Sequence, residues 1–187
     1  MKTLLQQCSQ RGVWLRLDAV SATSSGLEIS FRLLRGQHGK KLDVWKVICG
    51  GVREAKITEL DGGGLRLYTA HPAAQQYTHQ QAQLSWNGAA LNDDEILGAL
   101  YQGHLQEVYD WIPFDRYTNA EDIGAKKVVW QGPLFLMRAY AKALRAKGVQ
   151  VALKPGTKKA RQPPLKVLHF GDSYIVAASF KAQHQRV

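Results

Sequence analysis

The chain has 187 residues and a mass of 20.9 kDa, a size that suits one domain with a substantial hydrophobic core. Hydrophobic residues make up 45% of the sequence and charged residues 21%, which is ordinary for a soluble globular protein and argues against an intrinsically disordered chain. The formal net charge of +10 favours polyanionic partners, and apolar runs such as residues 174–180 are too short to span a membrane.

The N-terminal segment and the cysteines bear on the compartment. Leu4 and Leu5 are followed at once by polar glutamines, so the apolar segment is too short for a secretory signal peptide. Cys8 and Cys49 are the two cysteines of the chain and form no C-x-x-C motif, which argues against a disulfide-rich scaffold and against a cysteine-based zinc site. We therefore expect a protein of the reducing cytosol that carries no cofactor or metal and does not bind membranes.

The first strands are predicted from alternation. Apolar and polar residues alternate within residues 13–20 and within residues 27–33, which is typical of half-buried antiparallel strands. Residues 42–49 continue the series. The pair Gly50-Gly51 then predicts a bulge or a turn.

Three further strands complete this half of the chain. A glycine-rich turn at residues 61–64 predicts a hairpin between strands over residues 52–60 and 65–70. Residues 81–86, which end at an Asn-Gly turn, are expected to be the last strand of the half. Residues 13–86 are thus predicted to be mainly β structure.

The hydrophobic period then changes to that of helices. Asn92 is a good N-cap followed by three acidic residues, and the apolar pattern predicts a helix over residues 92–110. Pro133 and Gly148 mark the start and the end of a second helix. His104 lies near the centre of the apolar face of the first helix and is expected to be a hydrogen-bonded core residue.

The chain is expected to end in β structure. Residues 149–153 predict one strand, and residues 165–170 turn at a Gly-Asp-Ser sequence into a strand over residues 174–181. The proline-rich basic segment between these strands, residues 154–164, is expected to be a mobile loop.

The predicted fold class is α+β, in a single domain over residues 1–187. Residues 13–86 are expected to supply an antiparallel sheet that begins as an N-terminal meander. Residues 92–187 are expected to supply two helices, followed by a C-terminal strand and a β-hairpin that join or extend the sheet.

The positive charge is unevenly distributed along the sequence. Residues 1–119 hold 12 basic and 12 acidic residues, whereas residues 120–187 hold 13 basic and 3 acidic residues. Such a field attracts polyanions, most commonly nucleic acid. We therefore predict that ten basic residues contact the phosphate backbone of DNA or RNA: Lys126, Lys127, Arg138, Lys142, Arg145, Lys154, Lys158, Lys159, Arg161 and Lys166.

The leading functional hypothesis is a non-catalytic polyanion-binding module that binds nucleic acid as part of a larger complex. No helix-turn-helix, zinc-finger or aromatic RNA-binding signature is present, so no base preference is predicted. The alternative is a protein-binding inhibitor or adaptor whose basic face docks on an acidic partner. The sequence leaves both open.

A minority hypothesis is an enzyme, a Mg²⁺-dependent nuclease. Asp43, Glu54 and Lys56 have the order found in nucleases whose carboxylates hold the ion while a lysine stabilises the attacked phosphate. The exposed faces of strands often alternate charges for solubility alone. We expect these three residues not to converge on one site.

Overall fold

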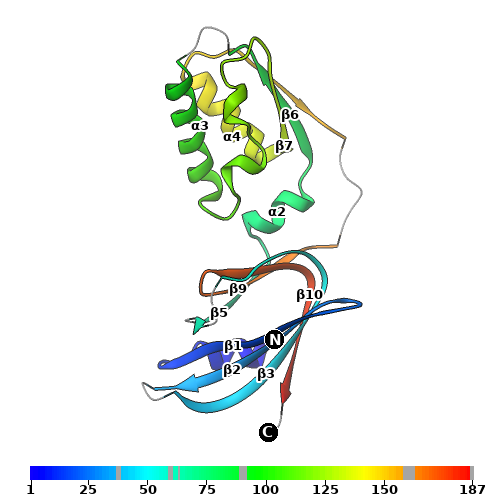
Figure 1. Cartoon of the computed structure of the whole chain (residues 1–187). Helices are drawn as coiled ribbons and strands as arrows, with labels where there is room; N and C mark the ends of the chain where they lie inside the picture. Colours follow the sequence, from blue (N-terminus) through cyan, green and yellow to red (C-terminus); the bar gives the residue numbers. More distant parts are fainter. Residues whose placement is uncertain (37–38, 59–60, 63, 89–91, 158–162, 186–187) are drawn as a thin grey trace. The chain divides into compact units, whose positions relative to one another are not determined.

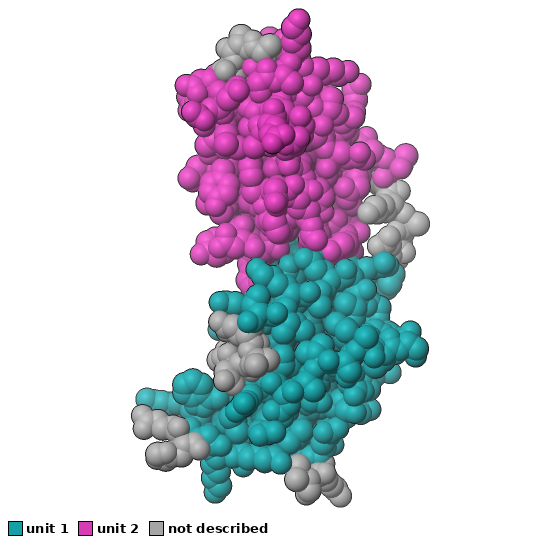
Figure 2. Space-filling model, viewed as in Figure 1, with its two compact units in different colours: residues 1–74, 163–187 teal, residues 75–162 magenta. Residues whose placement is uncertain are grey.

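The computed structural model divides into two compact units, shown in Figure 2. Unit 1 comprises residues 1–74 and 163–187, and unit 2 comprises residues 75–162. Each unit contains a hydrophobic core of its own. The structure describes residues 1–36, 39–58, 61–62, 64–88, 92–157 and 163–185.

The predicted α+β class, with antiparallel sheets that begin as an N-terminal meander, is confirmed. The prediction of one domain stays a prediction, because the division into units concerns packing and not the cooperativity of folding. In the described part of the chain, no helix has the length and the apolar character that a membrane crossing requires.

Unit 1 is built on one sheet with the strand order β4-β1-β2-β3-β10-β9-β5 (Figure 1). Every neighbouring pair of strands is antiparallel. A short helix, α1 (Lys2–Cys8), precedes the first strand. The strands are β1 (Val13–Thr23), β2 (Gly26–Arg35), β3 (Lys40–Lys56), β4 (Asp61–Gly62), β5 (Leu65–Tyr68), β9 (Lys166–Phe170) and β10 (Ser173–Gln185).

Alternation along β1 and β2 sends one set of side chains into the core of unit 1. Leu15 and Leu17 of β1 lie opposite Leu33 and Phe31 of β2, and all four side chains are buried. Leu4 of α1 is also buried in this core. Because successive side chains of a strand point to opposite faces, the residues between them lie on the outer face. The strands predicted from this alternation are therefore confirmed.

β3 continues through the predicted interruption at Gly50-Gly51. Gly51 has a φ of 64°, a conformation that side chains with a Cβ rarely adopt. The pairing with β10 shifts by one residue just beyond it, between Val52 and Glu54. The interruption is thus a bulge inside one long strand and not a turn, which were the two predicted alternatives.

The predicted hairpin between residues 52–60 and 65–70 is wrong. β10 pairs with β3 as far as Lys56, so that edge of β3 is already occupied by a strand from the end of the chain. β5 pairs instead with β9, and β4 pairs with β1. The local turn signal was outweighed by pairings between residues that lie far apart in the sequence.

Unit 2 contains a second, three-stranded sheet with the order β7-β6-β8. β6 is its central strand and is antiparallel to both neighbours. Residues 81–86 are therefore a strand, as predicted, but they do not extend the sheet of the first half. The elements are α2 (Pro72–Thr78), which crosses the unit boundary, β6 (Gln81–Trp86), α3 (Asp93–Val108), β7 (Val128–Pro133), α4 (Leu134–Ala146), β8 (Val151–Pro155), and two 3-10 turns, η1 (Phe114–Arg116) and η2 (Ala120–Asp122).

The two long helices begin and end at the predicted signals. The Asn92 side chain accepts a hydrogen bond from the Glu95 backbone N–H, which satisfies one of the free donors at the start of α3. Pro133 immediately precedes α4, and Gly148 follows it with a φ of 75°. The short elements α1, α2 and β7 were not predicted. Helices of seven residues, such as α1 and α2, complete about two turns and give little helical periodicity.

Candidate nucleic-acid interface

The sheet of unit 2 has one covered face and one open face. Helices α3 and α4 lie on one side of this sheet (Figure 1). They supply the core that covers the inner face, where Leu84, Trp86 and Trp130 are buried. Alternation then places Gln83 and Gln131, which lie opposite each other, on the outer face, and both are exposed. The outer face of this sheet is therefore accessible to a partner.

This outer face carries positive charge and amide groups. None of the residues in β6, β7 and β8 is acidic. Lys154 lies opposite Gln83, and Lys127 directly precedes β7 on the outward side. We define the outer sheet face by its outward residues: Gln81, Gln83, Ser85, Asn87, Lys127, Val129, Gln131, Gln150, Ala152 and Lys154.

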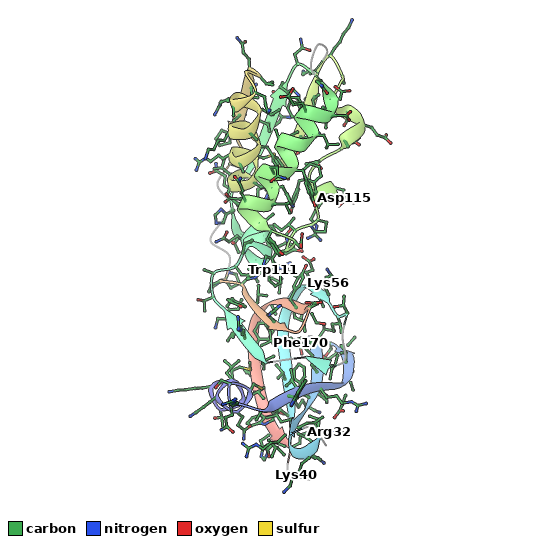
Figure 3. The ribbon with its side chains drawn as sticks, turned by 90° about the vertical axis from the view of Figure 1, so that its left-hand side faces the viewer. Arg32, Lys40, Lys56, Trp111, Asp115 and Phe170 are labelled. Atoms are coloured by element: carbon green, nitrogen blue, oxygen red, sulfur yellow. The ribbon has the colours of Figure 1, made fainter. Side chains whose placement is uncertain are left out.

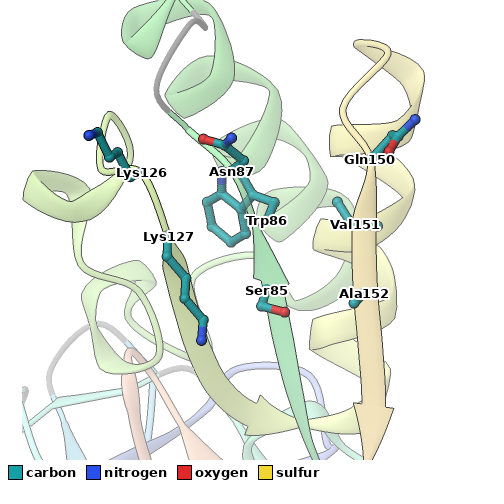
Figure 4. Close-up of a pocket in the computed structure, with 8 residues that line it drawn as sticks. All are labelled: Ser85, Trp86, Asn87, Lys126, Lys127, Gln150, Val151 and Ala152. Atoms are coloured by element: carbon teal, nitrogen blue, oxygen red, sulfur yellow. The ribbon is translucent and has the colours of Figure 1, made fainter.

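An open hollow of about 490 Å³ lies at one end of the outer sheet face. Figure 4 shows Lys126 and Lys127 on one side of the hollow, residues 150–152 on the other, and residues 85–87 of the central strand between them. The ammonium groups and the side-chain amides of this hollow are hydrogen-bond donors. Such a donor set suits an anion with several oxygens, such as a phosphate.

The segment that carries the two lysines is fixed to the end of β6. The Gly88 backbone N–H donates to the Ala125 carbonyl oxygen over 3.0 Å. A Cβ at Gly88 would overlap the carbonyl oxygen of Ile123, so this close approach requires glycine. Ile123 itself is 1% exposed and anchors the segment in the core of unit 2. Lys126 and Lys127 are thus held in place at the rim of the sheet.

A second hollow, of about 280 Å³, lies at the other end of the same face. Gln83, Gln131 and Lys154 line it together with Gly156. The Gly156 backbone N–H donates to the Gln81 carbonyl oxygen over 2.8 Å, which joins the end of β8 to the start of β6. Each end of the outer sheet face therefore combines lysine with amide side chains.

The predicted basic residues do not share one face. Arg138, Lys142 and Arg145 are exposed on α4, on the side away from its buried residues, so they point away from the sheet. Lys166 lies on β9 and belongs to unit 1. Lys158, Lys159 and Arg161 lie outside the described residues, as does the middle of the predicted mobile loop. Of the ten predicted residues, the structure brings Lys127 and Lys154 to the outer sheet face, and Lys126 lines the hollow at one end of it.

The fold redistributes the charge that the sequence places at the C-terminal end. Because unit 1 contains both ends of the chain, it holds 14 basic and 7 acidic residues, and unit 2 holds 11 basic and 8 acidic residues. The larger excess, +7, therefore belongs to unit 1, and unit 2 has +3. Counting charge along the sequence cannot show this division, since residues 1–74 and 163–187 come together only in the folded structure, through strand pairing and a shared core.

The amide residues of the outer sheet face were not among the predicted site residues. Gln83, Ser85 and Gln131 carry no charge and match no motif. The alternation Gln-Ala-Gln-Leu-Ser-Trp in β6 is the signal that identifies them, because it predicts one polar and one apolar face. The alternation alone does not show that the polar face is open. That conclusion also requires the structure, in which helices cover only the apolar face.

The nuclease residues do not converge, as expected. Asp43 and Glu54 lie eleven positions apart on the same strand, which is roughly 36 Å along the strand at ~3.3 Å per residue. Asp43 accepts hydrogen bonds from Gln7 Nε2 over 2.9 Å and from His184 Nε2 over 2.7 Å. Figure 3 shows Lys40 and Lys56, the first and last residues of β3, at opposite ends of unit 1. Within the described ranges, no group of three or more His, Cys, Asp or Glu side chains is placed to hold a metal ion.

His104 is a hydrogen-bonded core residue, as predicted. It is 1% exposed, and its Nε2 lies 2.7 Å from the Ile112 carbonyl oxygen, which can only accept a hydrogen bond. In the neutral ring Nδ1 therefore accepts from the Tyr140 hydroxyl, 2.7 Å away. Burial lowers the pKa of His104 and raises the pKa of Tyr140, which keeps both groups uncharged.

Comparison of the chain with protein-family models, with curated proteins and with solved structures gives no match. No relative therefore supplies a function by similarity. The functional conclusion depends on the surfaces of the two units.

Proposed function

We propose that this protein binds nucleic acid by holding the phosphate backbone on the outer sheet face of unit 2. The observation that carries the proposal is an exposed sheet face with lysines at both ends, amides between them and no acidic residue in its three strands. Lysine ammonium groups and side-chain amides are common donors to phosphate oxygens. The proposed role is non-catalytic.

The spacing of the lysines suits a run of phosphates. Lys127 is level with Asn87 and Lys154 is level with Gln83, on the two strands that flank β6. With ~3.4 Å per residue and ~4.8 Å between strands, their backbones lie roughly 17 Å apart. Along the helix axis, one strand of a duplex carries a phosphate about every 3.4 Å, so this distance corresponds to about five phosphate steps along the axis. Contacts of this kind carry no base preference.

Two broader parts of the hypothesis belong to the same proposal. The protein acts as a subunit of a nucleic-acid complex, and an acidic protein partner is the competing occupant of the same lysines. The cytosol is the proposed compartment, and the two buried free thiols, Cys8 and Cys49, are consistent with a reducing environment.

A salt titration tests the proposal. A fluorescently labelled duplex of about 20 base pairs is titrated with the protein between about 50 and 200 mM salt, and the logarithm of the affinity is plotted against the logarithm of salt concentration. The variant Lys127→Gln/Lys154→Gln is expected to bind more weakly and to flatten the slope by about 2, since each lost phosphate contact lowers it by about 1.

The matched control is Arg138→Gln/Lys142→Gln, which removes the same charge from the exposed side of α4. It should flatten the slope less than the sheet variant. The assignment to the outer sheet face would be contradicted if the wild type did not bind the duplex at low salt. It would also be contradicted if only the α4 variant lost affinity for the duplex. Equal affinity for poly-glutamate and for the duplex would favour the acidic protein partner instead.

A further inference from the structure

We propose that unit 1 carries a second nucleic-acid surface, specific for unpaired bases, on the outer face of its sheet around Trp14. This inference rests on the proposed function, since it assumes that the chain binds nucleic acid. It adds a site in the other unit and names the substrate class as single-stranded DNA or RNA.

The surface is centred on an exposed tryptophan. Trp14 of β1 is 56% exposed, whereas the next residue, Leu15, is 2% exposed and lies in the core. The other tryptophans in strands, Trp45, Trp86 and Trp130, are all buried. Burying a tryptophan stabilises a fold strongly, so an indole left on an open sheet face is available to a partner.

Basic residues surround this indole on the same face. Trp14 lies opposite Leu34, and Leu34 lies opposite Lys41 on the next strand. Two positions along β1, Arg16 lies opposite Arg32. We call these five residues the Trp14 face. Arg11, Arg35 and Lys40 are exposed at the same end of the strands, where Figure 3 places Arg32 and Lys40.

The two arginines form a like-charge pair, which costs stability when its members lie directly opposite each other. Asp18 offsets part of this cost through an ion pair with Arg32 of 3.1 Å, and Asp61 of β4 lies opposite Arg16 on its other side. The Arg32 side chain remains 41% exposed, although its Nε atom is itself buried. A phosphate at the exposed part of the Arg32 guanidinium would add a charge-assisted interaction beside the one with Asp18.

Aromatic and basic groups together favour a single strand. Unpaired bases stack on aromatic side chains while lysine and arginine follow the phosphates, which is how sheets bind single strands without sequence preference. A duplex keeps its base faces stacked internally and has none to offer Trp14. The Trp14 face has one large exposed apolar group, which is less than a membrane-inserting or obligate protein surface provides.

The test compares Trp14→Ala with the wild type on a labelled oligo-dT of about 15 nucleotides and on the duplex used above. The variant is expected to lose about 5- to 150-fold in affinity for oligo-dT and to keep its duplex affinity, because one stacked base is lost. Trp14→Phe should retain most of the binding. Val20→Ala is the matched control, since Val20 is also on β1 and 40% exposed.

Several outcomes overturn the inference. They are oligo-dT binding by Trp14→Ala that equals the wild type, an equal loss in Val20→Ala, and a Trp14-dependent affinity for vesicles of phosphatidylcholine and phosphatidylserine without oligo-dT binding. If Trp14→Ala unfolds, the quenching of tryptophan fluorescence by oligo-dT decides: the wild type should be quenched and Trp14→Phe should not, because the other four tryptophans of the chain remain in the variant. Equal quenching of the two proteins would contradict the inference. A failure of the proposed function gives a different result from a failure of this inference. If the proposed function is wrong, the wild type does not bind the duplex, or Lys127→Gln/Lys154→Gln binds it as well as the wild type.

Discussion

The two sheets of this protein direct their tryptophans differently, and the difference shapes the two outer faces. In unit 2, Trp86 and Trp130 pack edge to face inside the core, with ring centroids 4.8 Å apart. The outer sheet face is left with lysines and amides. In unit 1, Trp14 points outward beside arginines. A face of amides and ammonium groups suits phosphates, whereas an exposed indole among cations suits bases.

The two cores also differ in composition. The core cluster of unit 1 consists of apolar side chains, in which Phe31 and Phe170 meet edge to face at 5.1 Å. The core of unit 2 contains the hydrogen-bonded pair of His104 and Tyr140 among its aromatic residues. Unit 1 also contains a buried polar side chain, Ser173, whose Oγ accepts a hydrogen bond from the Thr58 backbone N–H. The buried polar pair of unit 2 differs because it lies among aromatic rings in the core and joins α3 to α4.

The largest expected effect comes from Phe31→Ala in unit 1. Phe31 is 0% exposed, so its truncation leaves a cavity and should lower the free energy of unfolding by about 3 to 5 kcal/mol. Hydrogen exchange should show lost protection in β1 and β2, while the amides of α4 in unit 2 stay protected. An equal loss of amide protection in both units would show that the two cores unfold together as one domain.

The next effect comes from Tyr140→Phe in unit 2. The substitution keeps the ring but removes the hydroxyl that bonds to His104 Nδ1, and it leaves this buried nitrogen without a partner. We expect the free energy of unfolding to fall by about 1 to 3 kcal/mol, measured by denaturant titration. A variant as stable as the wild type would mean that the hydrogen bond between Tyr140 and His104 adds nothing to the stability of unit 2.

The smallest effect is a pH dependence that belongs to unit 2. Burial lowers the pKa of His104, so below about pH 6.5 the unfolded chain binds a proton that the folded unit does not. The contribution of His104 to the stability of unit 2 should be fully present above pH 6.5 and should fall as the pH decreases. The free energy of unfolding should fall by at most about 1.4 kcal/mol for each decrease of one in pH.

Hydrogen exchange of the α4 amides between about pH 5 and 8 measures this dependence. His104→Gln should reduce it, although the variant is less stable at neutral pH. His71 and His169 of unit 1 also have a pKa lowered by burial, which is why the measurement is made on amides of unit 2. An unchanged slope in His104→Gln would assign the pH dependence to other groups.

The sequence by itself determined the local features. Asn92 and Gly148 define the helix ends because capping depends on a few neighbouring residues. Alternation places Trp14 on the side of Arg16 and Trp86 on the side of Leu84, since side chains change face at every residue of a strand. The sequence of each strand therefore shows which of its side chains share a face.

Only the tertiary structure decided which strands pair and which faces stay open. The pairing of β10 with β3 joins residues more than a hundred positions apart, and it replaced the hairpin that the turn at residues 61–64 predicts. It also brought both ends of the chain into unit 1, which moved the larger charge excess there. Pairing between distant strands depends on the summed burial of many side chains, and no short stretch of sequence contains that sum.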